Sequence, residues 1–203
     1  MSRYSRNRFI PVVLIVVVMI IAVVALVSLA RAIFFSGNRD TGKAAQQLEV
    51  GRTALLNVKE GNSVRMTVRG PIVAEEEFNS LRITVSSSAR SLVTYRGYLD
   101  KEIDRIELGN NVNAYTEFVN ALDKANLALG VPFEGEKDNT HGICATGRIY
   151  EYEIFEGGKV VQRLWASTCK GSPGSLKASI DQLTNLFIAQ IPDARTHLNK
   201  INF

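Results

Sequence analysis

The chain has 203 residues, of which 46% are hydrophobic and 22% are charged, and it contains two cysteines and two histidines. This length allows one ordinary domain with a short appendage, and the apolar content excludes a disordered chain. Residues 1–39 contain five arginines and no acidic residue, so the other 164 residues hold 19 Lys and Arg against 20 Asp and Glu. The net charge of +4 therefore comes from the N-terminal segment, and we expect no nucleic-acid partner.

An uncharged apolar run of 22 residues, 9–30, follows a basic tail, residues 1–8. As a helix this run would be roughly 33 Å long, enough for the ~30 Å hydrocarbon core of a bilayer. Residues 9–35 are therefore predicted to be a single-pass transmembrane signal anchor in the plasma membrane. The excess of arginine before the run predicts a cytoplasmic N-terminus. A cleaved signal peptide is the alternative, but such peptides usually have apolar cores of only ~7–15 residues.

The residues after the anchor are expected to lie outside the membrane. Residues 36–43 are polar, contain two glycines and are predicted to be a linker. Residues 44–203 are predicted to form one extracytoplasmic domain. Helix-forming residues over 43–56 predict its first helix.

Alternation of apolar and polar residues predicts the next elements. It predicts strands at 64–69 and 81–86, and a third strand at 92–98 that forms a hairpin with the second. The charged residues over 100–107 are interpreted as a solvated surface segment. Helical spacing of Tyr115, Phe118, Val119 and Leu122 predicts a helix over 110–129.

A second β unit follows a polar loop. The apolar run 143–155 turns at Glu156-Gly157-Gly158 and returns over 160–168, which predicts a hairpin. A last amphipathic helix is predicted to start at Ser175 and to end or kink at Pro192, with a short helix within 193–203. The predicted fold class is α+β: an N-terminal transmembrane helix, then an antiparallel sheet of hairpins covered by two amphipathic helices.

The only cysteines, Cys144 and Cys169, are predicted to form a disulfide because we place them outside the reducing cytosol. A turn at Glu156-Gly157 would make the two cysteines face each other across the base of the hairpin. A turn centred on Gly157-Gly158 would instead make the pair diagonal. Free buried thiols and a redox or metal site are the alternatives.

The same register predicts that one face of the second hairpin is rich in aromatic and basic side chains. We interpret this face as a candidate binding surface for a sugar, a peptide or a protein. The alternative is that the face is core beneath the helix that starts at Ser175, with the arginine stems at its edge. The candidate binding residues are Arg148, Tyr150, Tyr152, Arg163 and Trp165.

No catalytic motif is recognisable around either histidine, His141 or His197, and G-x-S-x-G, S-x-x-K and H-E-x-x-H are absent from the sequence. His141 alone cannot complete a zinc site with the two cysteines. We therefore expect no metal, no cofactor and no catalytic residue, although carboxylates from distant segments could still form an active site.

The run VRMTVRGPIVAEEE from Val64 to Glu77, together with the placement of the cysteines, the tyrosines around 150–152 and Leu164-Trp165, resembles small signal-anchored exported proteins of reduced-genome, host-attached bacteria. The resemblance covers most of the predicted extracytoplasmic domain. It implies an envelope location and no chemistry.

These observations favour a membrane-anchored envelope protein that displays a non-enzymatic binding or assembly domain. Its expected partner is a protein or a glycan at the cell surface. One alternative is a cell-wall or surface-acting hydrolase, which requires a cleft with converging carboxylates or a histidine. Another is an accessory subunit of a secretion or pilus machine.

Overall fold

The computed structural model describes residues 9–35, 38–98 and 100–199. The chain divides into two compact units, residues 1–45 and 46–203. The predicted basic tail, residues 1–8, lies outside the described residues. Of the predicted linker, residues 36–37 also lie outside them, and the remaining residues are helical and begin α2 (Asn38–Leu56).

Helix α1 (Phe9–Phe35) occupies the segment predicted to cross the membrane. Its side chains are described over residues 13–28, where they are exposed. Within the described part of the chain, no helix is long and apolar enough to cross a membrane. This finding contradicts the transmembrane helix of the predicted fold class, which is therefore corrected.

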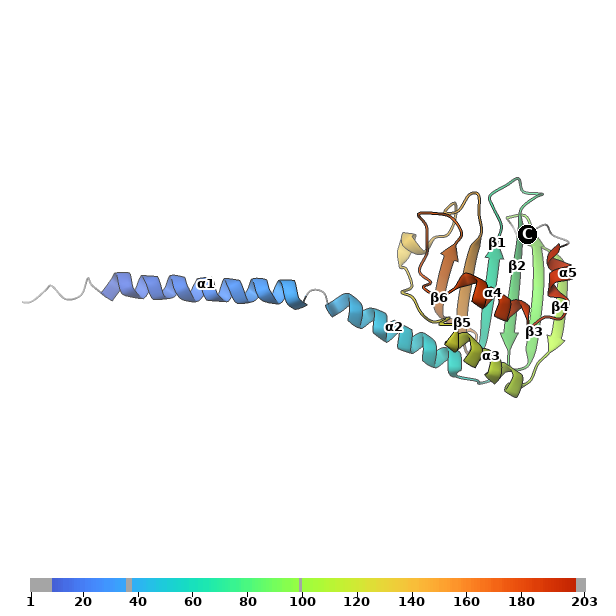
Figure 1. Ribbon diagram of the computed structural model, residues 1–203, viewed down its shortest axis with the longest axis horizontal. Helices are drawn as coiled ribbons and strands as arrows, with labels where there is room; N and C mark the ends of the chain where they lie inside the picture. The colour runs from blue at the N-terminus through green and yellow to red at the C-terminus, as the bar shows by residue number, and fades with distance from the viewer. Residues whose placement is uncertain (1–8, 36–37, 99, 200–203) are drawn as a thin grey trace, which may run out of the picture. The chain divides into compact units, whose positions relative to one another are not determined.

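The second unit is an α+β fold built on a six-stranded antiparallel sheet (Figure 1). The strands are ordered β4-β3-β2-β1-β5-β6. The β5–β6 hairpin therefore joins the first four strands through the pairing of β5 with β1. The predicted hairpin of the second and third strands is confirmed. The strands are β1 (Ser63–Arg69), β2 (Asn79–Ser86), β3 (Ala89–Arg96), β4 (Lys101–Gly109), β5 (Ile149–Glu156) and β6 (Lys159–Ser167).

Strand β4 differs from the solvated segment that the sequence predicted. It pairs with β3 along its length and forms one edge of the sheet. Only Ile106 and Leu108 pack against the core, while Arg105 bonds Glu102 and Glu107 on the exposed side. Charged side chains on an edge strand discourage pairing with another chain, which explains why this strand has the composition of a surface segment.

Two amphipathic helices cover one face of the sheet, α3 (Val112–Lys124) and α4 (Ile180–Ile188) (Figure 1). The Asn111 side chain caps α3 by accepting a hydrogen bond from the Ala114 N–H. Helix α3 ends earlier than predicted because Asn126 adopts the left-handed conformation, with φ of 60°. Helix α4 starts later than predicted because its cap is Ser179 and not Ser175.

The core lies between these helices and the sheet. Phe187 of α4 is fully buried, and its ring centroid lies 5.3 Å from that of Phe118 on α3 and 5.9 Å from that of Tyr152 on β5. The predicted short C-terminal helix is present as α5 (Ala194–Asn199). The other face of the sheet carries no α-helix among the residues of the second unit that the structure describes, and the candidate site lies there.

The second hairpin has a different register from the predicted one. Its turn is Gly157-Gly158, where both residues have positive φ, and a bulge shifts the register between Ile154 and Phe155. Tyr152 consequently pairs with Leu164, and not with Val161. The predicted disulfide is confirmed, with 5.5 Å between the two Cα atoms, but Cys144 and Cys169 lie beyond the ends of the strands and not within the ladder.

Candidate functional site

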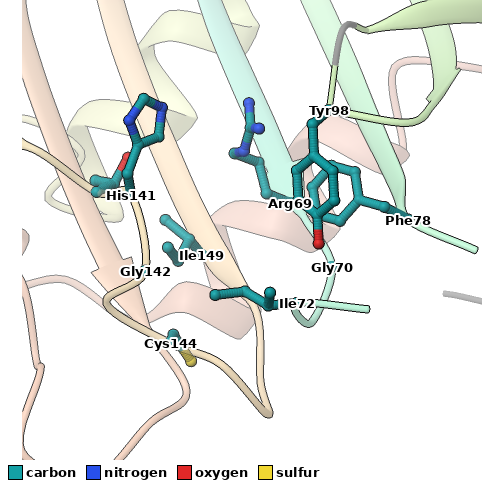
Figure 2. Close-up of a pocket in the computed structure, with 10 residues that line it drawn as sticks. Arg69, Gly70, Ile72, Phe78, Tyr98, His141, Gly142, Cys144 and Ile149 are labelled. Carbon is teal, nitrogen blue, oxygen red and sulfur yellow. The ribbon is translucent and has the colours of Figure 1, made fainter. Parts of the chain in front are cut away.

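A pocket of about 450 Å³ opens at the end of the sheet where β1 ends and β5 begins (Figure 2). Three segments far apart in the sequence surround it: the β1–β2 loop, the turn after β3, and the segment before β5. Its lining residues are Arg69, Gly70, Ile72, Phe78, Tyr98, Thr140, His141, Gly142, Cys144 and Ile149.

Arg69, the last residue of β1, is held against an aromatic pair. Its guanidinium carbon lies 5.3 Å from the centroid of the Phe78 ring. Phe78 in turn stacks on Tyr98, with 4.2 Å between ring centroids and 20° between the ring planes. Phe78 is buried and Tyr98 is partly exposed, so the pair joins the core to the mouth of the pocket. The electron-rich face of Phe78 stabilises the guanidinium charge.

Hydrogen bonds from Tyr98 hold the β1–β2 loop in place. The Tyr98 hydroxyl donates to the Val73 carbonyl (2.6 Å) and accepts from the Val73 N–H (3.0 Å), while the Tyr98 N–H donates to Glu75 Oε2 (3.0 Å). Gly97 lies just before it with φ of 79°, and a Cβ there would overlap the Glu75 carboxylate. Another residue here would be strained at this φ and would displace the Glu75 side chain.

The disulfide fixes the opposite wall. It ties Cys144 to Cys169, just beyond the end of β6. The Ala145 carbonyl accepts a hydrogen bond of 2.8 Å from the Ile72 N–H, so this wall is also joined to the β1–β2 loop. The Thr140 hydroxyl donates to Glu151 Oε1 on β5, at 3.1 Å. All three segments around the pocket are thus tied to the sheet or to each other.

Arg163 of β6 organises the base of this wall. Its guanidinium pairs with Asp138 (2.6 Å) and Glu151 (2.9 Å), and it donates a hydrogen bond to the Asp138 carbonyl. Burial lowers the pKa of Arg163, but the charges of Glu151 and Asp138 outweigh burial and raise this pKa overall. The arginine stays charged and holds the segment that carries Thr140.

Arg69 differs in its electrostatic surroundings from most of the other arginines of this face. Arg65, Arg105 and Arg163 each form an ion pair with at least one carboxylate. Arg82 lies over the Tyr95 ring and donates to its hydroxyl (3.1 Å). Among the described residues, no carboxylate lies within ion-pair distance of Arg69, and none of the residues that line the pocket is acidic. The pocket therefore has a positive charge beside an aromatic and aliphatic wall.

The structure does not bring the predicted binding residues together. Tyr150 and Tyr152 face the helices and are buried, whereas Arg163 and Trp165 lie on the other face of the sheet. Arg148 lies just before β5. Burial raises the pKa of the Tyr152 phenol, whose hydroxyl is within 3.2 Å of the Thr184 hydroxyl, so Tyr152 belongs to the core. Trp165 is covered by Phe133, at 5.8 Å between ring centroids.

Sequence reasoning missed most of the residues that form the pocket. Arg69 was one of several polar positions in an alternating strand, and Phe78 and Tyr98 belong to loops that differ in length. The available signal was a glycine at the end of a strand next to an arginine or a tyrosine, side chains that are common in binding sites. This combination occurs in Arg69-Gly70 and in Gly97-Tyr98. Across the described ranges, no group of three or more His, Cys, Asp and Glu side chains is placed to hold a metal ion.

Comparison with known proteins gives no family: no protein-family model matches the chain, and no curated protein is significantly similar to it.

Proposed function

We propose that residues 46–203 form a binding domain that works outside the reducing cytosol, at the cell envelope, and that its binding site is the pocket beside Arg69. The observation that carries this proposal is the combination of an aromatic pair and an arginine without a carboxylate partner in a cavity of about 450 Å³. Ligand sites typically have mostly apolar walls and a few polar groups that fix orientation.

The disulfide supports the location. Disulfides form and persist in oxidising compartments and are rare in the cytosol, where thiols are kept reduced. Here the bond closes a wall of the pocket, because Cys144 is one of its lining residues. A domain that kept these thiols reduced would lose the covalent tie of that wall to the rest of the fold.

Binding is favoured over hydrolysis by the chemistry of the lining. Hydrolysis of a glycan by the common mechanism uses two carboxyl groups on either side of the scissile bond. The side chains that line this pocket offer one guanidinium, one imidazole and two hydroxyls, of which that of Thr140 donates to Glu151 and that of Tyr98 donates to the Val73 carbonyl. This set can orient and hold a ligand. The expected partner is a protein or a glycan at the cell surface.

Photo-cross-linking in intact cells tests the proposal with the full chain. A benzophenone amino acid in place of Ile72, at the pocket mouth, is expected to capture a partner on irradiation. Val160, in the second hairpin, is the matched control because its exposed fraction, 48%, equals that of Ile72, 47%. Capture at position 72 and not at 160 supports the pocket. Equal capture at both positions, or none at 72, contradicts it.

A further inference from the structure

We infer that the pocket recognises a carboxylate carried on an apolar or aromatic body. This inference rests on the proposed function and names the class of ligand that the same site would bind. It begins from the unmatched charge of Arg69. Burying or half-burying an arginine without an anion costs free energy, and on this face the pairing of Arg65 and Arg163 with carboxylates avoids that cost.

The position of Arg69 determines which of its groups are available. Phe78 covers one face of the guanidinium, so the N–H donors that lie in its plane remain for a ligand. No described residue accepts a hydrogen bond from them. A planar guanidinium edge matches the two oxygens of a carboxylate in a bidentate pair.

The charge balance favours a monoanion over a phosphate group. Arg69 is the one permanently charged cation among the lining residues, which matches one negative charge. A phosphate dianion would need a second cation or several backbone N–H donors directed at it. His141 faces the same opening, with its ring on the side of the Arg69 guanidinium (Figure 2).

The remaining walls determine the rest of the ligand. Ile72 and Ile149 lie below Arg69 in Figure 2, away from the guanidinium, and the Phe78–Tyr98 pair forms the flank. A ligand with its carboxylate at Arg69 would therefore place an apolar group against these side chains. A cavity of about 450 Å³ holds one large side chain or a small aromatic acid, and not an extended polymer.

Calorimetric titration of the full-length protein tests this ligand class. The probes are N-acetyl-phenylalanine and N-acetyl-phenylalaninamide, which share the apolar body and differ in the carboxylate. We expect the acid to bind roughly 10- to 100-fold more tightly than the amide, the range for hydrogen bonds to a charged group. R69Q should abolish this difference. R96Q is the matched control, because Arg96 is exposed on β3 and does not line the pocket.

The same chemistry could come from the C-terminus of a peptide or from a free acid. Tighter binding of an acetylated tripeptide ending in phenylalanine than of 3-phenylpropionate identifies a chain terminus, and the reverse order identifies a free acid. Either order supports the inference. Equal binding of acid and amide, or no binding of the acid, overturns it. The proposed function fails separately, when cross-linking at Ile72 captures nothing. Melting curves of R69Q and R96Q establish that both variants are folded.

Discussion

Removing the disulfide should destabilise the domain by an amount set by the loop that it closes. Cys144 and Cys169 are 25 residues apart in the sequence. In the chain-entropy treatment, a loop of this size corresponds to about 3.5 kcal/mol at 25 °C. A domain of this size has a total stability of roughly 5–15 kcal/mol, so the C144A/C169A variant should still fold but with a much smaller margin.

Urea unfolding of the wild type and of C144A/C169A, each followed by circular dichroism, measures this cost. With a slope of about 2 kcal/mol per M, the midpoint should fall by about 1.7 M. The wild type in excess reductant should unfold at nearly the midpoint of the double variant, because both then lack the same cross-link. Thiol titration of the denatured, non-reduced wild type should find no free cysteine.

A midpoint shift below about 0.5 M would refute this reasoning, since the cross-link would then contribute less than a third of the expected entropy. A full shift in the double variant with no shift in reduced wild type would also contradict it. In that case the alanine substitutions would act through lost packing of the buried Cys144 side chain, and not through the bond.

Three further predictions concern the core. F187A should cost about 3–5 kcal/mol in urea unfolding and F187L clearly less, because the fully buried Phe187 ring contacts both Phe118 and Tyr152; equal costs would contradict this packing. G51A should destabilise the domain by about 1–3 kcal/mol, since its Cβ would overlap the buried Gln162 amide. In a double-mutant cycle, most of this cost should disappear when Q162A is also present. Additive effects of the two substitutions would exclude the contact. Burial raises the pKa of Tyr115 to about 12, so the unfolded state loses this phenolic proton first, and Tyr115 alone should lower stability by about 1.4 kcal/mol per pH unit between pH 10 and 12. Tyr152, whose pKa burial also raises, adds to the slope of the wild type. Y115F should make the slope shallower by the contribution of Tyr115, and an unchanged slope would refute the assignment.

Local patterns predicted the elements that have one buried and one exposed face. The alternation over 64–69 and 81–86 is the burial pattern of β1 and β2, in which every second side chain enters the core. The helical stripe of Tyr115, Phe118 and Leu122 is likewise the buried face of α3. Strand β4 was missed because it lies at an edge, where none of its side chains is fully buried and charged residues occupy most positions.

The sequence could not show which side chains share a face of the second hairpin. This depends on whether the pairing register shifts by an odd or an even number of residues. Glu156-Gly157 and Gly157-Gly158 are both acceptable turns from the sequence, and the bulge after Ile154 adds one more residue of offset. The combined shift is odd, so Arg163 and Trp165 move to the face opposite to Tyr150 and Tyr152. The predicted disulfide is confirmed, but the predicted register, which placed the two cysteines opposite each other in the hairpin, is wrong.

The pocket was out of reach of sequence reasoning for a different reason. Arg69 ends β1, whereas Phe78, Tyr98 and His141 come from three connections, and each of the four is unremarkable in its own segment. Their proximity follows from the order of the strands, in which β1 lies between β2 and β5. That order places the end of β1 beside the start of β5, and no local pattern specifies it.

The three connections around the pocket are unusually well constrained for loops. Loops are commonly mobile, and ordering them on binding costs affinity. Here Tyr98 bonds Val73 through both donor and acceptor, Ile72 bonds Ala145, and the disulfide anchors the last segment. These ties hold the aromatic pair and Arg69 in place before any ligand arrives. Elsewhere on this face Arg65, Arg105 and Arg163 are already paired with carboxylates, whereas Arg69 is not, so the pocket beside Arg69 is where we expect an external anion to bind.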